Sequence, residues 1–129
     1  MSRLPDPPRY AVLVVENDPV IRAEAMDLAI EAGFKAYGAR DAERAIRALE
    51  RHDEIRICFT DVDMPGSCDG VRLAAAVRER WPPVEFIIVS SQAKATPDEM
   101  PARSVAFSKP YDPTEILHAL GNFGRRIQA

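Results

Sequence analysis

Short apolar runs alternate along the chain with longer segments in which apolar residues recur at the spacing of a helix. The run at residues 10–15 is continuous and β-prone, as expected for a strand that is buried on both faces. Four further runs, at residues 34–38, 55–60, 84–89 and 105–108, indicate four more strands. The pattern therefore predicts five strands with helices between them.

Each predicted helix carries an amphipathic stripe, and three of them begin with a recognisable cap. Asp18 is followed by Pro19, a pairing typical of an N-cap and the first helical position, and Asp41 has the position of a second cap. Residues 112–115 have the spacing of a capping box, and Gly33 predicts the end of the first helix. The expected buried stripes are Ile21, Ala25, Leu28, Ala29 and Ala32; Ala42, Ala45, Ile46 and Leu49; Leu73, Val77 and Trp81; and Ile116, Leu120, Phe123 and Ile127.

The alternation of strands and helices indicates βαβ units with right-handed crossovers. We therefore expect an α/β fold, a doubly wound five-stranded parallel sheet with helices on both faces. The stretch between Ser91 and Val105 is short, and Pro97 and Pro101 interrupt it. Because proline inside a helix costs about 3 kcal/mol, the fourth helix is expected to be short or missing.

Polar side chains occur where the predicted strands end, the edge at which doubly wound sheets bind ligands. Glu16 and Asn17 follow the first strand, Asp61 the third, Ser90 the fourth, and Lys109 the fifth. Carboxylate and amide oxygens suit Mg²⁺, whereas an ammonium and a hydroxyl suit phosphoryl oxygens. Together these groups describe a site at which an aspartate accepts a phosphoryl group while a metal neutralises charge.

Each of these residues also has an ordinary structural explanation. Asp18 has the position of a helix cap, Ser90 is equally typical of one, and Lys109 before a proline is typical of a surface charge at a turn. Only the combination at four strand ends indicates the chemistry.

Four segments, taken in this order, resemble the receiver domain of two-component response regulators. They are Glu16-Asn17-Asp18-Pro19, Asp61-Val62-Asp63-Met64-Pro65, Ser90-Ser91 and Ser108-Lys109-Pro110, and the resemblance runs from about residue 10 to about residue 123. It implies the flavodoxin-like receiver fold with strand order 2-1-3-4-5. It also implies a phosphoacceptor signalling domain rather than an enzyme, one that assists its own phosphorylation and dephosphorylation.

The same resemblance implies a role for each residue at the strand ends. Asp61 would be the phosphoacceptor, charged by the phosphohistidine of a sensor histidine kinase or a histidine phosphotransfer protein. Ser90 would donate a hydrogen bond to the phosphoryl group, and Lys109 would pair with it. Mg²⁺ would be held by Glu16, Asn17, Asp61 and the backbone carbonyl of Asp63. The output would be contact with a downstream protein.

Two positions depart from the pattern of the family. Asn17 stands where most receivers carry a metal-coordinating aspartate, so the site keeps an oxygen ligand but loses a negative charge, and weaker Mg²⁺ binding is expected. Ala106 stands where many receivers carry a switch aromatic, with Phe107 beside it. The usual aromatic switch is therefore expected to be absent or displaced.

Composition narrows the class of protein further. The 129 residues include 17 basic and 20 acidic side chains, and a net charge of −3 argues against a nucleic-acid partner. The sequence has no apolar run long enough to span a membrane, no secretory signal, and too few cysteines for a disulfide framework. We therefore expect one cytoplasmic domain over residues 10–129, preceded by a flexible Pro-rich tail over residues 1–9.

Four other side chains are expected to be structural. Cys58, inside a predicted strand, is expected to be a small core residue, and Trp81 to fill the core at the end of a helix. His52 and His118 are expected to be exposed to solvent.

Three alternative functions compete with a phosphorylated receiver. The first is a degenerate receiver that docks partners without phosphorylation. The second is a phosphatase, because Asp61-Val62-Asp63 resembles the Asp-x-Asp motif of haloacid dehalogenases, although Pro65 and the position after the third strand argue against it. The third is a flavodoxin-like cofactor binder, which the carboxylates after the first strand disfavour because they would repel a flavin phosphate.

Overall fold

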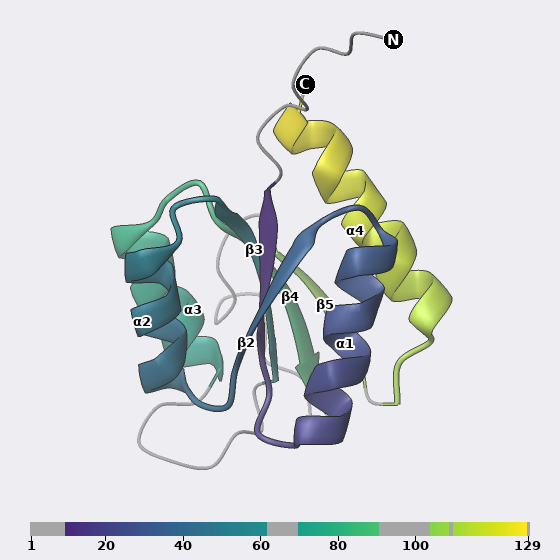
Figure 1. Ribbon diagram of the computed structural model, residues 1–129, viewed down its shortest axis with the longest axis horizontal. Coiled ribbons are helices and arrows are strands. Elements are labelled where there is room, and N and C mark those ends of the chain that lie inside the picture. Colours follow the sequence, from purple (N-terminus) through teal and green to yellow (C-terminus); the bar gives the residue numbers. More distant parts are fainter. Residues whose placement is uncertain (1–9, 62–69, 91–103, 109, 129) are drawn as a thin grey trace, which may run out of the picture.

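A computed structural model describes residues 10–61, 70–90, 104–108 and 110–128, and it shows a parallel sheet between two pairs of helices (Figure 1). The strands are β1 (Ala11–Val15), β2 (Lys35–Ala39), β3 (Ile55–Asp61), β4 (Glu85–Ser90) and β5 (Ser104–Ser108). The helices are α1 (Pro19–Glu31), α2 (Ala42–Arg51), α3 (Gly70–Arg80) and α4 (Pro113–Gln128). The strand order is β2-β1-β3-β4-β5, which confirms the predicted doubly wound fold.

The element bounds differ from the prediction by about one residue. The strand expected at 34–38 is β2 at Lys35–Ala39, and β3 includes Asp61 as its last residue. The fourth helix is expected to be short or missing between residues 91 and 105, and residues 91–103 lie outside the described part of the chain. The predicted tail, residues 1–9, lies outside it as well.

The helix ends follow the local signals in the sequence. The Asp18 carboxylate accepts the backbone N–H of Val20 at 2.8 Å, and Asp41 and Asp112 cap α2 and α4 in the same way. Beyond α1, Gly33 adopts a φ of +100°, a left-handed conformation that favours glycine. These caps fix where each helix leaves the sheet.

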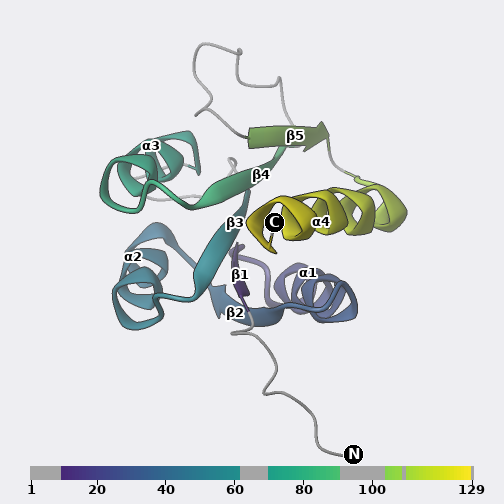
Figure 2. The ribbon, with the colours of Figure 1, turned by 90° about the horizontal axis from the view of Figure 1, so that it is seen from above.

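Both faces of the sheet are covered, and each face has its own hydrophobic core (Figure 2). Figure 2 shows α2 and α3 on one side of the strands and α1 and α4 on the other. Cys58 belongs to the core beneath α2 and α3, where burial raises the pKa of its thiol to about 12. The predicted structural role of Cys58 is therefore confirmed, and Trp81 is half-buried against the same core.

An irregularity in β3 changes which face its residues present. Ala11 pairs with Ile55, but the next residue, Val12, pairs with Ile57, so Arg56 is an extra residue on β3. Ile55 consequently packs in the core under α2 and α3, whereas Ile57 packs in the core under α1 and α4. Because side chains alternate along a strand, this shift also decides the face of every later residue of β3.

The prediction that His52 is exposed to solvent is wrong. Its ring is half-buried and stacks on Tyr37 of β2, with ring centroids 4.0 Å apart and planes at 15°. The Tyr37 hydroxyl donates a 2.6 Å hydrogen bond to the Glu54 carboxylate, and this bond raises the pKa of Tyr37 and lowers that of Glu54. The cause is the return of the chain after α2, which brings residue 52 beside β2. His118 is exposed, as expected.

Candidate functional site

Two buried acidic residues lie at the carboxyl ends of the neighbouring strands β1 and β3. Val15 of β1 pairs with Thr60 of β3, so Glu16 and Asp61 are the next residues on adjoining strands, which run about 4.8 Å apart. Only 4% of Glu16 and 5% of Asp61 is exposed. The sheet register thus brings together two buried carboxylates from residues 45 positions apart in the sequence.

Three contacts fix the backbone and side chain of Glu16. Its N–H donates to the carbonyl of Ala39 at the end of β2 (2.9 Å), and its carboxylate accepts the N–H of Asp18 (2.9 Å). Its own carbonyl accepts a hydrogen bond from the guanidinium of Arg22 on α1, also at 2.9 Å. These contacts hold the turn between β1 and α1 in one arrangement.

Within that turn, the two residues after Glu16 face solvent. Asn17 is exposed, so its amide is accessible beside the two buried carboxylates. Asp18 is also exposed, and its carboxylate accepts the N–H groups of Val20 and Ile21. The ordinary explanation of Asp18 as a helix cap is therefore confirmed.

The remaining predicted site residues occur on β4 and β5 or lie outside the described residues. Asp61 pairs with Val89, and Ser90 pairs with Ser108, so the backbone of Ser90 lies one step beyond the partner of Asp61. The described part of the chain includes the backbone of Ser90 but not its side chain, and it excludes Asp63 and Lys109. The register accordingly brings Glu16, Asp61 and Ser90 to one edge of the sheet.

The donor set at this edge suits a hard divalent cation. Two adjacent buried carboxylates repel each other, and a cation between them offsets that repulsion. Within the described ranges, no group of three or more His, Cys, Asp or Glu side chains could hold a metal ion. Of the four predicted Mg²⁺ ligands, two are the carboxylates of Glu16 and Asp61 and one is the amide of Asn17. The fourth is the backbone carbonyl of Asp63, which lies outside the described residues. Oxygen donors of this kind fit Mg²⁺, which commonly binds through one or two carboxylates and retains several waters.

On β5, the position at which the family carries a switch aromatic is occupied by Ala106, with Phe107 as the next residue. Phe107 is partly buried and packs against the core under α1 and α4, whereas Ala106 is exposed. Because neighbouring residues of a strand point to opposite faces, Phe107 does not present its ring on the face of Ala106. The aromatic ring is thus on the other face of β5 from the predicted switch position.

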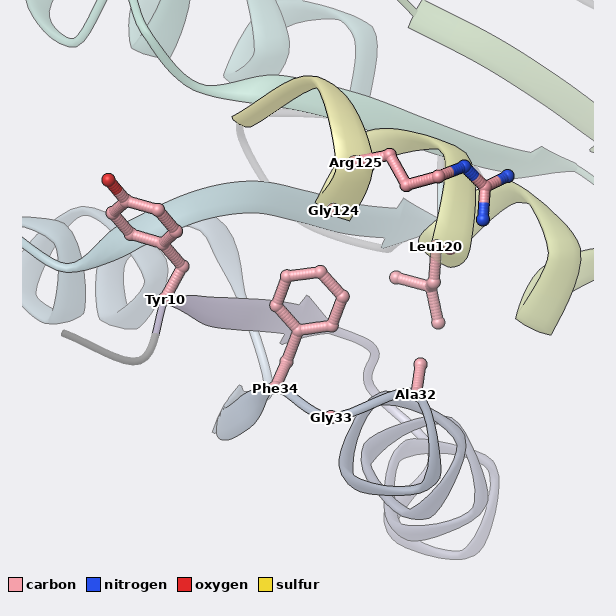
Figure 3. Close-up of a pocket in the computed structure, with 8 residues that line it drawn as sticks. Tyr10, Ala32, Gly33, Phe34, Leu120, Gly124 and Arg125 are labelled. Atoms are coloured by element: carbon pink, nitrogen blue, oxygen red, sulfur yellow. The ribbon is translucent and has the colours of Figure 1, made fainter. Parts of the chain in front are cut away.

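A hollow of about 270 Å³ lies at the opposite edge of the sheet, near the amino end of β1 (Figure 3). Tyr10 and Phe34 form an aromatic wall, and Gly121, Gly124 and Arg125 of α4 form the other side. It contains none of the predicted site residues. The hollow is therefore separate from the acidic edge.

Sequence reasoning did not identify Arg22 as part of the site. The arginine lies one turn into α1, four residues beyond the capping Asp18, and that spacing is the available signal. A cation one turn after an acidic strand end is placed to reach back to the strand, although the spacing alone does not give its partner.

The fold and the acidic edge define a doubly wound α/β protein with a carboxylate site at the ends of β1 and β3. The sequence model of the response regulator receiver domain matches residues 12–121, which is most of the chain. The chain therefore belongs to the response regulator receiver domain family, a family of signalling domains rather than classical enzymes. This confirms the resemblance seen in the sequence.

Individual relatives agree with this assignment. The chain is 25% identical over 118 residues to a "Probable transcriptional regulator ycf29" of Pyropia yezoensis, covering 88% of this chain and 52% of the relative. It is 28% identical over 118 residues to the response regulator protein FleR of Pseudomonas aeruginosa, covering 85% of this chain and 24% of FleR. The chain thus spans about half the length of one relative and a quarter of the other.

A solved structure shows the same fold. The signal receiver domain of an HD domain-containing protein from Pseudomonas fluorescens Pf-5 matches with a TM-score of 0.79 at 23% identity. The match covers 92% of this chain and 96% of that chain. Among the described residues, no helix has the length and apolar character that crossing a membrane requires.

Proposed function

We propose that this receiver accepts a phosphoryl group on Asp61 from the phosphohistidine of a histidine kinase or histidine phosphotransfer protein. A carboxylate oxygen of Asp61 attacks phosphorus, and the imidazole leaves with the electrons of the broken P–N bond. The new P–O bond makes an acyl phosphate on the protein. The observation that carries the proposal is the register of β1 and β3, which sets buried Asp61 beside buried Glu16.

The position of Asp61 suits this reaction. It is the last residue of β3, a strand that lies between β1 and β4, and it pairs with Val89 of β4 at the ligand-binding edge of the sheet. A carboxylate held in a fixed position loses little freedom when it meets the phosphorus. Ser90 and Lys109 are the proposed partners of the transferred phosphoryl group.

Glu16, Asn17, Asp61 and the carbonyl of Asp63 are the proposed ligands of Mg²⁺. When bound, the metal offsets the negative charge that builds up as a phosphoryl group approaches two carboxylates. Glu16 is positioned for this role by its contacts with Ala39, Asp18 and Arg22. Since Asn17 contributes a neutral amide, metal affinity should be lower than with an aspartate at that position.

The proposed unit is residues 10–129, and its proposed output is binding of a downstream protein that senses the phosphorylated state. No nucleic-acid contact is part of the proposal, since the sequence carries a net charge of −3.

Phosphorylation at Asp61 is tested by incubation with Mg²⁺ and a small phosphodonor, followed by intact-mass measurement. The wild type should gain one phosphoryl mass, and Asp61→Asn should gain none. Asp27→Asn, which changes an exposed acid on α1, is the matched control and should behave as the wild type. Modification of Asp61→Asn to the same extent as the wild type would contradict the assignment.

A degenerate receiver that only docks partners is the second candidate, and the neutral Asn17 at a metal-ligand position favours it. A wild type that gains no phosphoryl mass, with phosphodonor and Mg²⁺ in excess, would support that candidate. Steady release of phosphate from a phosphomonoester, without a stoichiometric adduct, would instead support the phosphatase alternative.

A further inference from the structure

We propose that Arg22 is a positioning residue of the acidic site, and that the absence of a side chain at Gly38 makes room for it. The inference rests on the proposed function, because it concerns how Glu16 is presented to Mg²⁺. Arg22 on α1 and Gly38 on the edge strand β2 are not among the predicted Mg²⁺ ligands.

The contact between Arg22 and Glu16 is specific. The guanidinium Nη1 donates to the backbone carbonyl of Glu16 at 2.9 Å, and the bond is partly buried. A charged donor makes a stronger hydrogen bond to a carbonyl than a neutral one does. The contact joins the first turn of α1 to the residue that leaves β1.

With this contact, the N–H, the carbonyl and the carboxylate of Glu16 each have a hydrogen-bond partner. Its N–H is held by Ala39, and its carboxylate is held by the N–H of Asp18. With Arg22 on the carbonyl, both peptide groups flanking the Cα of Glu16 are fixed, and the side chain is directed from a rigid backbone. Without Arg22, the peptide between Glu16 and Asn17 has one fewer restraint and can rotate.

The path of the Arg22 side chain explains why residue 38 of β2 is a glycine. A Cβ atom built on Gly38 would lie 3.2 Å from Cδ and 3.5 Å from Nε of Arg22, and 2.8 Å from Sδ of Met26. The Arg22 side chain therefore crosses directly over the backbone of Gly38 on its way to Glu16. A side chain at position 38 would have to displace Met26, and it would also press against Cδ of Arg22.

Two effects of Arg22 on metal binding have opposite signs, which makes the inference testable. Its positive charge is held at the backbone carbonyl of Glu16 and by itself opposes the binding of a cation nearby. Its hydrogen bond orients Glu16 and favours binding. We expect orientation to dominate, as for other groups that hold metal ligands in place, so loss of Arg22 should weaken Mg²⁺ binding roughly tenfold.

The experiment compares the wild type with Arg22→Met, Arg22→Lys and Arg47→Met. Arg47 is an exposed arginine on α2 that pairs with Glu43, and its replacement is the matched control. Mg²⁺ affinity is measured by calorimetric titration of the unphosphorylated protein. Hydrogen exchange at the amide of Asp18 is measured without metal, because that amide reports whether the Glu16 carboxylate stays in place.

Arg22→Met should raise the Kd for Mg²⁺ roughly tenfold and speed exchange at Asp18. Arg22→Lys, which retains a charged donor, should restore part of both, and Arg47→Met should change neither. Unchanged or tighter Mg²⁺ binding by Arg22→Met would overturn the inference, and so would unchanged exchange at Asp18. A wild type that binds no Mg²⁺ would contradict the proposed function, while the exchange measurement would still test Arg22.

Gly38→Ala provides a second route should Arg22→Met fail to fold. It should reproduce part of the loss of Mg²⁺ affinity, because the new methyl group would press against Cδ of Arg22 as well as Sδ of Met26. In a double-mutant cycle, Gly38→Ala should have little further effect once Arg22 is already replaced by Met. Independent, additive effects of the two changes would contradict the proposed crossing.

Discussion

Two glycines three residues apart on α4 should respond differently to replacement by alanine. Gly121 faces open space, since a Cβ there would meet only Nη1 of Arg125, at 3.7 Å. Gly124 faces Phe34, in the connection between α1 and β2, and a Cβ there would lie 3.2 Å from Cζ of that ring. Phe34 is 6% exposed and belongs to the core under α1 and α4, so its ring has little room to move.

The magnitudes follow from these contacts. Alanine in a helix interior is more favourable than glycine by about 0.5–1 kcal/mol, so Gly121→Ala should stabilise the protein by that amount. For a domain of this size the gain corresponds to a rise in Tm of about 2–4 °C. Gly124→Ala has the same helix gain, but overpacking against Phe34 costs about 1–3 kcal/mol. Its net effect should be a loss of about 0–2.5 kcal/mol.

The assay is urea unfolding followed by circular dichroism, with Tm measured separately. Gly121→Ala should raise the midpoint and Gly124→Ala should leave it unchanged or lower it, both at constant m-value. A third comparison removes the obstacle: in a Phe34→Leu background, which lacks Cζ, Gly124→Ala should be stabilising. Equal stabilisation by the two alanines in the wild-type background would refute the close approach of α4 to Phe34.

Three further predictions concern the acidic edge and the core. Asn17→Asp should tighten Mg²⁺ binding, because it restores a negative charge to the donor set; unchanged or weaker affinity in a calorimetric titration would show that residue 17 is not a ligand. Asp18→Ala should cost about 1 kcal/mol in urea unfolding, because α1 loses its cap, whereas Asp18→Asn should retain most of that stability; equal losses would mean that the charge rather than the cap matters. The chain has two cysteines, Cys58 and Cys68, so the test of Cys58 uses a Cys68→Ser background. Cys58, whose pKa is raised to about 12 by burial, should then resist a thiol reagent at pH 8 until the protein unfolds, and rapid labelling of the native protein would contradict its burial.

Much of the fold could be predicted from local sequence signals. The strand at 10–15 was recognisable because it is apolar throughout, and β1 is indeed fully buried. Asp18, Asp41 and Asp112 were recognisable as caps because a cap acts over three residues. Asp61 beside Glu16 could be anticipated as well, since parallel strands bring their carboxyl ends to one edge.

Features that depend on contacts between distant segments could not be predicted in this way. The alternation at Ile55, Arg56 and Ile57 indicates two isoleucines on one face, but the extra residue on β3 places them in different cores. His52 looked exposed because nothing near it in the sequence indicates Tyr37 as a stacking partner.

The amino-acid sequence by itself determined the element types, the helix caps and the residues available for chemistry, because these depend on neighbours within one turn or one strand. Only the tertiary structure decided that Arg22 crosses Gly38 to reach the carbonyl of Glu16. That contact joins α1, β2 and the end of β1, and its geometry exists only once the sheet register and the packing of α1 are both fixed.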